Sequence, residues 1–124
     1  LSSQIPRTAL LSAVAAREAL EDAGIEDLKG LRAGFISANT VGGMDKTEDF
    51  FESFMKNPAS GRLRDVVHHE CGSVTEIVAD HLGIRHFIST ISTACSSSAN
   101  AVFTGARMIR HGLLDLAVAG GADA

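Results

Sequence analysis

Blocks of helical and strand-like hydrophobic periodicity alternate along this chain. Residues 7–23 carry apolar side chains at intervals of three and four positions, with Leu10 and Val14 among those expected to face a core. Gly24 follows this block and is expected to cap the helix at its C-terminus. The next apolar run, residues 33–38, is short and follows a polar stretch, and so predicts a buried strand.

A second helical block, residues 45–56, ends before Asn57 and Pro58, because proline cannot continue the hydrogen-bond ladder of a helix. Its phenylalanines lie at helical spacing and are expected to form a packed wall, in the core or at an interface. Its charged residues are expected to form a solvated face. The phenylalanines are Phe50, Phe51 and Phe54, and the charged residues are Asp45, Lys46, Glu48, Asp49 and Glu52.

Two further steps from helix to strand complete the pattern. The third helix is predicted to open on a capping box of Ser73 and Glu76 and to end at Gly83. Strands that alternate with helices predict an α/β fold, in which helices cover a parallel sheet. No linker or repeat interrupts the pattern, so residues 1–124 are expected to form one unit. The expected helices span residues 7–23, 45–56, 73–82 and 96–111, and the expected strands span 33–38, 86–92 and 114–119.

Composition and charge narrow the classes of function. The chain is 45% hydrophobic with a net charge of -4, and Lys and Arg form no basic run, so nucleic acid is not an expected partner. The apolar stretches are too short to cross a bilayer and no leader-like segment opens the chain, so a soluble, cytoplasmic protein is expected. Both cysteines are expected to be thiols, and no metal is expected because no Cys or His pairs have zinc-site spacing.

Cys95 lies where the strand ending near Thr93 passes into the helix starting near Ser96. Unpaired N–H groups in the first turn of a helix and the positive end of its dipole favour a thiolate there, and the same N–H groups can bind an oxyanion. Small neighbours leave room for a thioester carbonyl to approach the sulfur. Cys95 therefore occupies the position of a nucleophile elbow. From this position alone, however, Cys95 could equally well be a small apolar residue of the core.

The helix after Cys95 is expected to be deeply buried. Val102, Phe103 and Ile109 belong to its predicted apolar face. Gly105 costs about 1 kcal/mol relative to alanine inside a helix, so another backbone is expected to pack against it.

Several segments resemble those of the β-ketoacyl synthases. The cysteine run and the later glycine-containing strand end are similar to that family's nucleophile region, and the order of the other elements matches as well. The resemblance implies a thiolase-like fold of two similar α/β halves, of which this chain matches most of the N-terminal half. The matching segments are 93–98, 116–123, the helix at 15–24, the glycine loop at 41–44 that borders the acyl pocket, and the helix at 72–83.

The resemblance also implies a reaction and its participants. Cys95 would accept an acyl group, and malonyl-acyl carrier protein would then be condensed with it in a decarboxylative Claisen reaction of fatty acid or polyketide biosynthesis. Val41 would line the acyl pocket. Acyl carrier protein would bring both substrates on its phosphopantetheine, with no metal or redox cofactor. A homodimer is expected, in which the strand at 86–92 pairs with its copy.

The ends of the sequence indicate a fragment, because it starts without Met and stops just after a strand where a parallel sheet would continue. The family's catalytic histidines and lysine lie in the second half, so the chain is expected to be inactive alone.

Other interpretations stay open. A cysteine hydrolase would need His68 or His69 as the base for Cys95, although surface histidines are the simpler interpretation. A coenzyme A-using thiolase or initiating synthase would share the fold and the cysteine, but the run at 93–97 and the helix after it are more similar to the elongating synthases. A non-catalytic partner subunit would share the fold only, and retention of Cys95 counts against it. Cys71 is expected to be structural or incidental, because its irregular surroundings predict no helix start that would activate it.

Overall fold

The structure is a computed structural model that describes residues 5–124. Its element order is the predicted one, and most boundaries lie within two residues of those expected from the sequence. The helices are α1 (Arg7–Asp22), α2 (Met44–Lys56), α3 (Cys71–Leu82) and α4 (Ser97–Arg110), the short 3-10 helices are η1 (Leu63–Asp65) and η2 (Ala94–Ser96), and the strands are β1 (Ala33–Ala38), β2 (Phe87–Ile91) and β3 (Leu116–Gly121).

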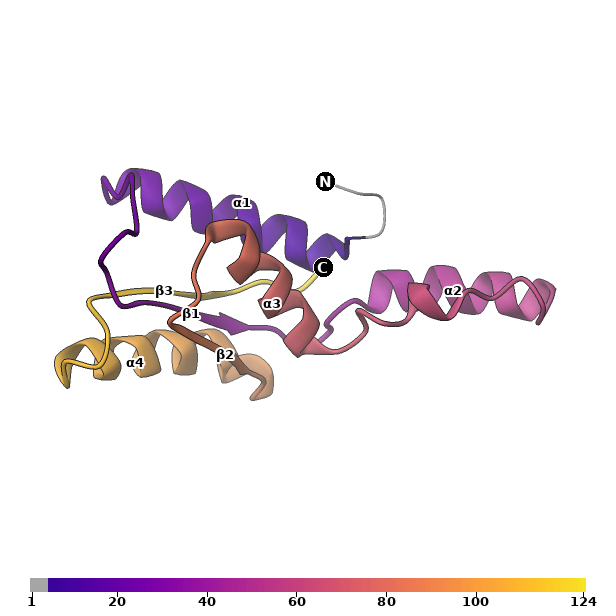
Figure 1. Ribbon diagram of the computed structural model, residues 1–124. Helices are drawn as coiled ribbons and strands as arrows, with labels where there is room; N and C mark the ends of the chain where they lie inside the picture. The colour runs from indigo at the N-terminus through magenta and orange to yellow at the C-terminus, as the bar shows by residue number, and fades with distance from the viewer. Residues whose placement is uncertain (1–4) are drawn as a thin grey trace.

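The strands form a parallel sheet in the order β2-β1-β3, with helices on both faces (Figure 1). Every residue of the central strand β1 is buried, which accounts for its mostly apolar sequence, in which Ser37 is the one polar residue. Phe35 joins a cluster with α1 and α3 on one face, whereas Ile36 joins a cluster with α4 on the other. The α/β class expected from the sequence is therefore confirmed.

The face by which α1 packs differs from the prediction. Ala9, Ala13 and Ala16 are the buried apolar residues, whereas Leu10 is half-buried and Val14 is 56% exposed. Small side chains let a helix approach its neighbours closely, so the alanine stripe is the one that packs inward. The pattern of large apolar residues pointed to the wrong face.

α4 shows the same reversal. Ala101 and Gly105 are buried against the sheet, whereas Phe103, on the predicted core face, is 59% exposed. A Cβ on Gly105 would lie 3.2 Å from Ala117 Cβ and 3.3 Å from Ile36 Cδ1. The expectation that a backbone packs there is wrong, because side chains of the sheet occupy that position.

The predicted capping box at the start of α3 is also wrong. The helix begins two residues earlier, at Cys71, and its N-cap Glu70 makes no side-chain cap hydrogen bond. Ser73 lies within the first turn, where its hydroxyl is 3.5 Å from the Val67 carbonyl oxygen. Gly83 does end the helix, in a left-handed conformation with φ of 72°.

Arg32 and Asp115 join the amino ends of β1 and β3. The Arg32 side chain donates to Asp115 from Nη2 (2.6 Å) and Nε (3.1 Å), and its backbone N–H donates at 2.8 Å. Arg32 Nη1 also donates to the Gly112 carbonyl at 2.7 Å. Hydrogen bonds from the Arg32 side chain, and then from its backbone, lower the pKa of Asp115 from 3.8 to about 2.

Replacing Asp115 with asparagine should lower the thermal midpoint at neutral pH, because the amide accepts fewer of these bonds. A lowered folded-state pKa stabilises the fold above the unfolded pKa, and that contribution disappears as pH falls through about 2. The difference in midpoint between wild type and variant should therefore shrink between pH 4 and pH 2, as followed by circular dichroism. A difference that is constant over this range would contradict the role of the Asp115 charge.

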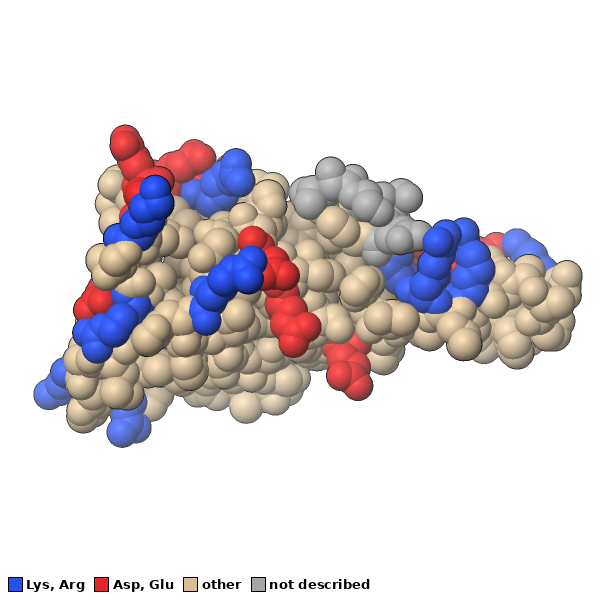
Figure 2. Space-filling model, viewed as in Figure 1, with Lys and Arg blue, Asp and Glu red and all other residues tan. Residues whose placement is uncertain are grey.

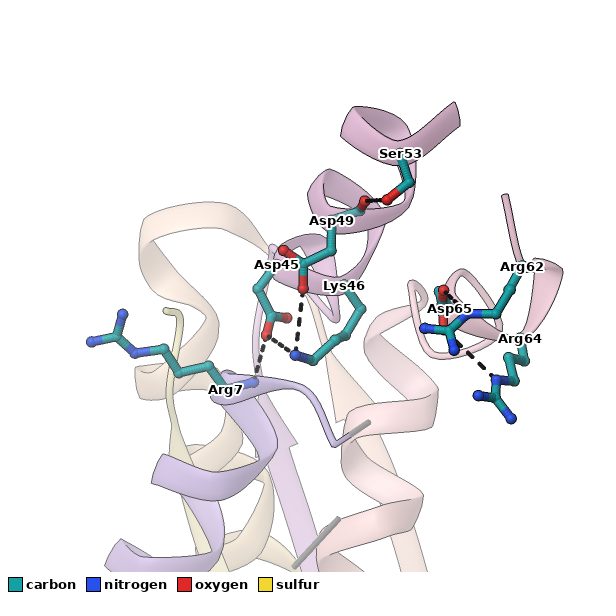
Figure 3. Close-up of polar contacts among 8 residues, drawn as sticks. All are labelled: Arg7, Asp45, Lys46, Asp49, Ser53, Arg62, Arg64 and Asp65. Atoms are coloured by element: carbon teal, nitrogen blue, oxygen red, sulfur yellow. Dashed lines mark hydrogen bonds and ion pairs between the residues drawn. The ribbon is translucent and has the colours of Figure 1, made fainter. Parts of the chain in front are cut away.

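α2 projects from the body of the molecule (Figure 1) and contains no buried residue, although the structure describes all of it. Its base is tied to α1, where Asp45 Oδ2 accepts from the Arg7 backbone N–H at 3.1 Å (Figure 3). Lys46 Nζ lies 3.6 Å from Asp45 Oδ2 and 3.7 Å from Asp49 Oδ2. Asp45 and Lys46 are therefore half-buried at this base, and only the more distal charges are solvated as expected.

The phenylalanines of α2 lie on this projecting arm. Phe50 and Phe54 stack with their ring centroids 5.7 Å apart, and Phe51 is 59% exposed. The prediction that these phenylalanines belong to the core is wrong. The prediction that they lie at an interface stays a prediction. The tip of the arm is largely uncharged on the face shown in Figure 2, and acidic and basic side chains are interspersed over the body.

Candidate functional site at the carboxyl edge of the sheet

Three connections leave the carboxyl edge of the sheet, which is where open parallel α/β sheets bind their ligands. The register aligns Ala38 at the end of β1 with Ile91 of β2 and Gly121 of β3. β1 leads into the loop 39–43, β2 into η2, and β3 into residues 122–124. The candidate site is built from these connections.

Cys95 is exposed within η2, between the end of β2 and the start of α4. Its predicted position is thus confirmed, and the interpretation as a buried core cysteine is wrong. The preceding residue, Ala94, has a φ of 52° and is the one non-glycine residue with positive φ among residues 5–124. This left-handed conformation costs alanine about 1–2 kcal/mol, so the rest of the turn must hold it in place.

Side chains around Cys95 hold this turn. Ser97 Oγ accepts from the Thr93 N–H and donates to the Ala94 carbonyl, both at 2.7 Å. Ser96 Oγ donates to the Thr93 carbonyl at 2.8 Å, and Asn100 Nδ2 donates to Thr93 Oγ1 at 2.8 Å. Ser96 and Ser97 are therefore structural parts of the site. From the sequence, these serines were expected only to leave room beside Cys95.

The amino end of α4 faces the same turn. Its N-cap, Ser96, forms no side-chain cap hydrogen bond in the described chain, and the Ser97 N–H donates to the Ala94 carbonyl within the turn. The remaining N–H groups of a first helical turn have no partner within the helix. Donors at a helix start stabilise a thiolate or a developing oxyanion. The arrangement therefore suits a nucleophilic thiol that attacks a carbonyl carbon.

The loop after β1 is held tightly against the segment before α3. Gly42 has a φ of 57°, and a Cβ there would lie 2.0 Å from the His69 carbonyl oxygen. A Cβ on Gly43 would lie 2.1 Å from the His68 carbonyl oxygen, and Gly43 N–H donates to His69 at 3.1 Å. Only glycine permits this approach, so Val41 lies next to a turn of fixed geometry.

Asp123 joins the segment after β3 to the same loop. Its Oδ1 accepts from the N–H groups of Thr40 (2.7 Å) and Val41 (3.1 Å), and its Oδ2 accepts from Thr40 Oγ1 (2.7 Å). Burial acts to raise the pKa of Asp123, but these hydrogen bonds outweigh it and hold the pKa below its usual value. Sequence reasoning did not single out this residue, because its partners lie more than 80 positions away.

The family model for the beta-ketoacyl synthase N-terminal domain matches residues 2–124. The chain belongs to this family. Its fold is thiolase-like, as the resemblance implied, and solved ketosynthases share it. The solved ishigamide ketosynthase/chain length factor superimposes on 98% of this chain and 31% of its own, with a TM-score of 0.87 and 26% identity.

A curated relative and a second solved structure match over similar ranges. Nodulation protein E of Rhizobium meliloti is 29% identical over 120 residues, which cover 95% of this chain and 30% of that protein. A solved complex of a type II polyketide synthase acyl-carrier protein with its ketosynthase bound to the hexaketide matches 97% of this chain and 32% of its own. Its TM-score is 0.80 at 26% identity. The chain thus spans about a third of the length of these relatives.

Cys71 of this ketosynthase-family chain corrects a prediction from the sequence, whereas His69 is exposed and fits the surface-histidine interpretation. Cys71 is half-buried as the first residue of α3, so the expectation that no helix starts beside it is wrong. His69 Nδ1 forms a 2.8 Å hydrogen bond with Thr47 Oγ1, and its carbonyl packs on Gly42. His69 therefore has a structural role that needs no catalytic explanation.

Among residues 5–124, no helix is both long and apolar enough to cross a membrane. In the same part of the chain, no three His, Cys, Asp or Glu side chains gather as they would around a metal ion.

Proposed function

We propose that Cys95 is the acyl-accepting nucleophile of a β-ketoacyl synthase and that this chain supplies the nucleophile region of that enzyme. The observation that carries the proposal is the exposed thiol on a strained strand-to-helix turn of a ketosynthase-family fold. The Ser97 and Asn100 hydrogen bonds hold the turn, so the sulfur is positioned before substrate arrives. Cys71 is half-buried on a different element and is not assigned this role.

The proposed chemistry has two stages. The Cys95 thiolate attacks the thioester carbonyl of an acyl-acyl carrier protein, a C–S bond to Cys95 forms as the C–S bond to phosphopantetheine breaks, and phosphopantetheine leaves as a thiolate that takes up a proton from water. A malonyl thioester then loses carbon dioxide, and the resulting carbanion attacks the acyl-cysteine carbonyl. A C–C bond forms, the C–S bond breaks, and the thiolate of Cys95 is restored. This sequence requires no metal or redox cofactor.

The proposed partners are an acyl carrier protein and a second subunit of the same fold. Among the matched structures, one is a ketosynthase/chain length factor and another is a ketosynthase with its acyl-carrier protein. β2 is an edge strand, so its outer side is open to pairing across a two-fold axis. A homodimer remains our prediction, and a chain-length-factor-like partner is the alternative that the first structure favours. We place the reaction in the cytoplasm.

The acyl pocket is proposed to lie beside Val41, which is half-buried in the glycine loop at the same sheet edge as Cys95. In this proposal, Val41 influences acyl-chain length more than it influences the chemistry. A coenzyme A-using thiolase or an initiating synthase would use the same cysteine with a different acyl donor.

The deciding experiment supplies the complete synthase with an acyl-carrier thioester and carboxyl-labelled malonyl-acyl carrier protein. Release of labelled carbon dioxide together with a β-ketoacyl product would support condensation. Acylation from coenzyme A alone, without a malonyl-dependent product from carrier-bound substrates, would favour the thiolase or initiating synthase. No acylation from either donor would support a non-catalytic subunit.

A further inference from the structure

Asp123 lies in the connection that leaves β3, and both of its carboxylate oxygens accept hydrogen bonds from one loop. Oδ1 accepts from two successive backbone N–H groups, at Thr40 and Val41, and Oδ2 accepts from the Thr40 hydroxyl. Two anchored oxygens fix the orientation of the carboxylate as well as its position. The loop that contains Val41 is therefore held from its β1 side.

The other side of the loop is anchored independently. Gly42 and Gly43 pack directly on the carbonyl oxygens of His69 and His68, with no room for a Cβ between them. Gly43 N–H also donates to the His69 carbonyl. Val41 thus lies between the Asp123 carboxylate on one side and the Gly42–Gly43 turn on the other. Of these two anchors, only Asp123 can be substituted without adding a side chain where the turn packs on backbone.

The Asp123 segment also adjoins the Cys95 turn. A Cβ on Gly121 would lie 2.2 Å from Ser98 Oγ in the first turn of α4, so the end of β3 and the helix that follows Cys95 are in close contact. Ala122 N–H donates to the Ala38 carbonyl at 3.1 Å, which keeps the segment on the sheet edge. The end of β3 and the start of α4 lie at the same end of the sheet in Figure 1.

We infer that Asp123 is a positioning residue, which holds the loop 40–43 beside the Cys95 turn and thereby sets which acyl chains reach the thiol. The inference rests on the proposed function, because it takes Cys95 as the acylated residue and Val41 as a wall of the acyl pocket. It adds a role for a side chain that contacts neither sulfur nor substrate. Selectivity should respond to such a residue because a small displacement of a pocket wall changes discrimination between chain lengths.

The test compares Asp123→Ala and Asp123→Asn with Asp115→Asn in the complete synthase. Asp115 is a matched control, because it is another carboxylate that flanks β3, and its bonds to Arg32 lie at the opposite edge of the sheet. Hydrogen exchange of the peptide covering residues 39–44 reports on the loop. Acylation of Cys95 by butyryl- and dodecanoyl-pantetheine, followed by intact mass spectrometry, reports on selectivity.

Both Asp123 variants should speed exchange in the 39–44 peptide and change the dodecanoyl-to-butyryl ratio of acylation rates about tenfold. Asp115→Asn should leave both readouts at wild-type values even if it lowers thermal stability. Unchanged exchange in Asp123→Ala would overturn the positioning role, and faster exchange with an unchanged ratio would overturn its effect on selectivity. Absence of acylation at Cys95 in wild type would instead overturn the proposed function, and with it the role of Asp123 in selectivity. The hydrogen-exchange result would still decide whether Asp123 holds the loop.

Discussion

Replacing Cys95 with alanine should abolish covalent acylation of the complete synthase and almost eliminate condensation. Removing the nucleophile of a catalytic unit costs on the order of a millionfold in turnover, because the remaining groups have no atom to which the acyl group can be transferred. The substitution should leave the fold intact, since Cys95 is exposed and the turn is held by Ser97 and Asn100. Intact mass spectrometry after incubation with an acyl-carrier thioester measures the loss directly.

Cys71→Ala is the matched control for this prediction. It removes the other thiol of the chain, which is half-buried at the start of α3. This variant should keep the acyl adduct and most of the activity. An adduct that persists in Cys95→Ala, or that disappears in Cys71→Ala, would assign the nucleophile to another residue.

Replacing Gly42 with alanine should destabilise the fold by about 2–4 kcal/mol. Two costs add, because the residue has a φ of 57° and because its new Cβ would lie 2.0 Å from the backbone oxygen of His69. A backbone atom cannot rotate away as a flexible side chain can, so the loop or the segment before α3 must shift. Chemical denaturation followed by circular dichroism gives the free energy of unfolding.

Gly24→Ala separates these two costs. Gly24 has a φ of 69°, but a Cβ there would meet nothing within 4 Å. This variant should therefore lose only about 1 kcal/mol, which is the left-handed penalty alone. Equal losses at the two positions would show that the contact with His69 contributes nothing to stability.

The position of Cys95 could be predicted because it depends on local signals. A β-branched run, a cluster of small residues and an apolar helical period place a strand, a turn and a helix in that order, whatever the rest of the chain does. The strained φ of Ala94 could not be predicted in the same way. It results from the hydrogen bonds that Ser97 makes on both sides of the turn.

The packing faces of α1 and α4 were mispredicted for one reason. Hydrophobic periodicity assigns large apolar residues such as Val14 and Phe103 to the core, although both are exposed in this structure. The residues that pack are small, such as Ala13 and Gly105, because close approach to the sheet depends on available space as well as on apolar character. Such space exists only once the elements are assembled.

The amino-acid sequence alone was enough to predict the helices and strands, their order and the α/β class. It also placed Cys95 between a strand and a helix. These features depend on short-range hydrophobic periodicity and on backbone propensity. Assembly was needed to establish the strand order, the helix faces, the glycine turn against His69 and the Asp123 and Arg32 hydrogen bonds. These contacts join residues far apart in the sequence, such as Thr40 and Asp123. Their partners are selected by three-dimensional register, for which a single sequence carries no local signal.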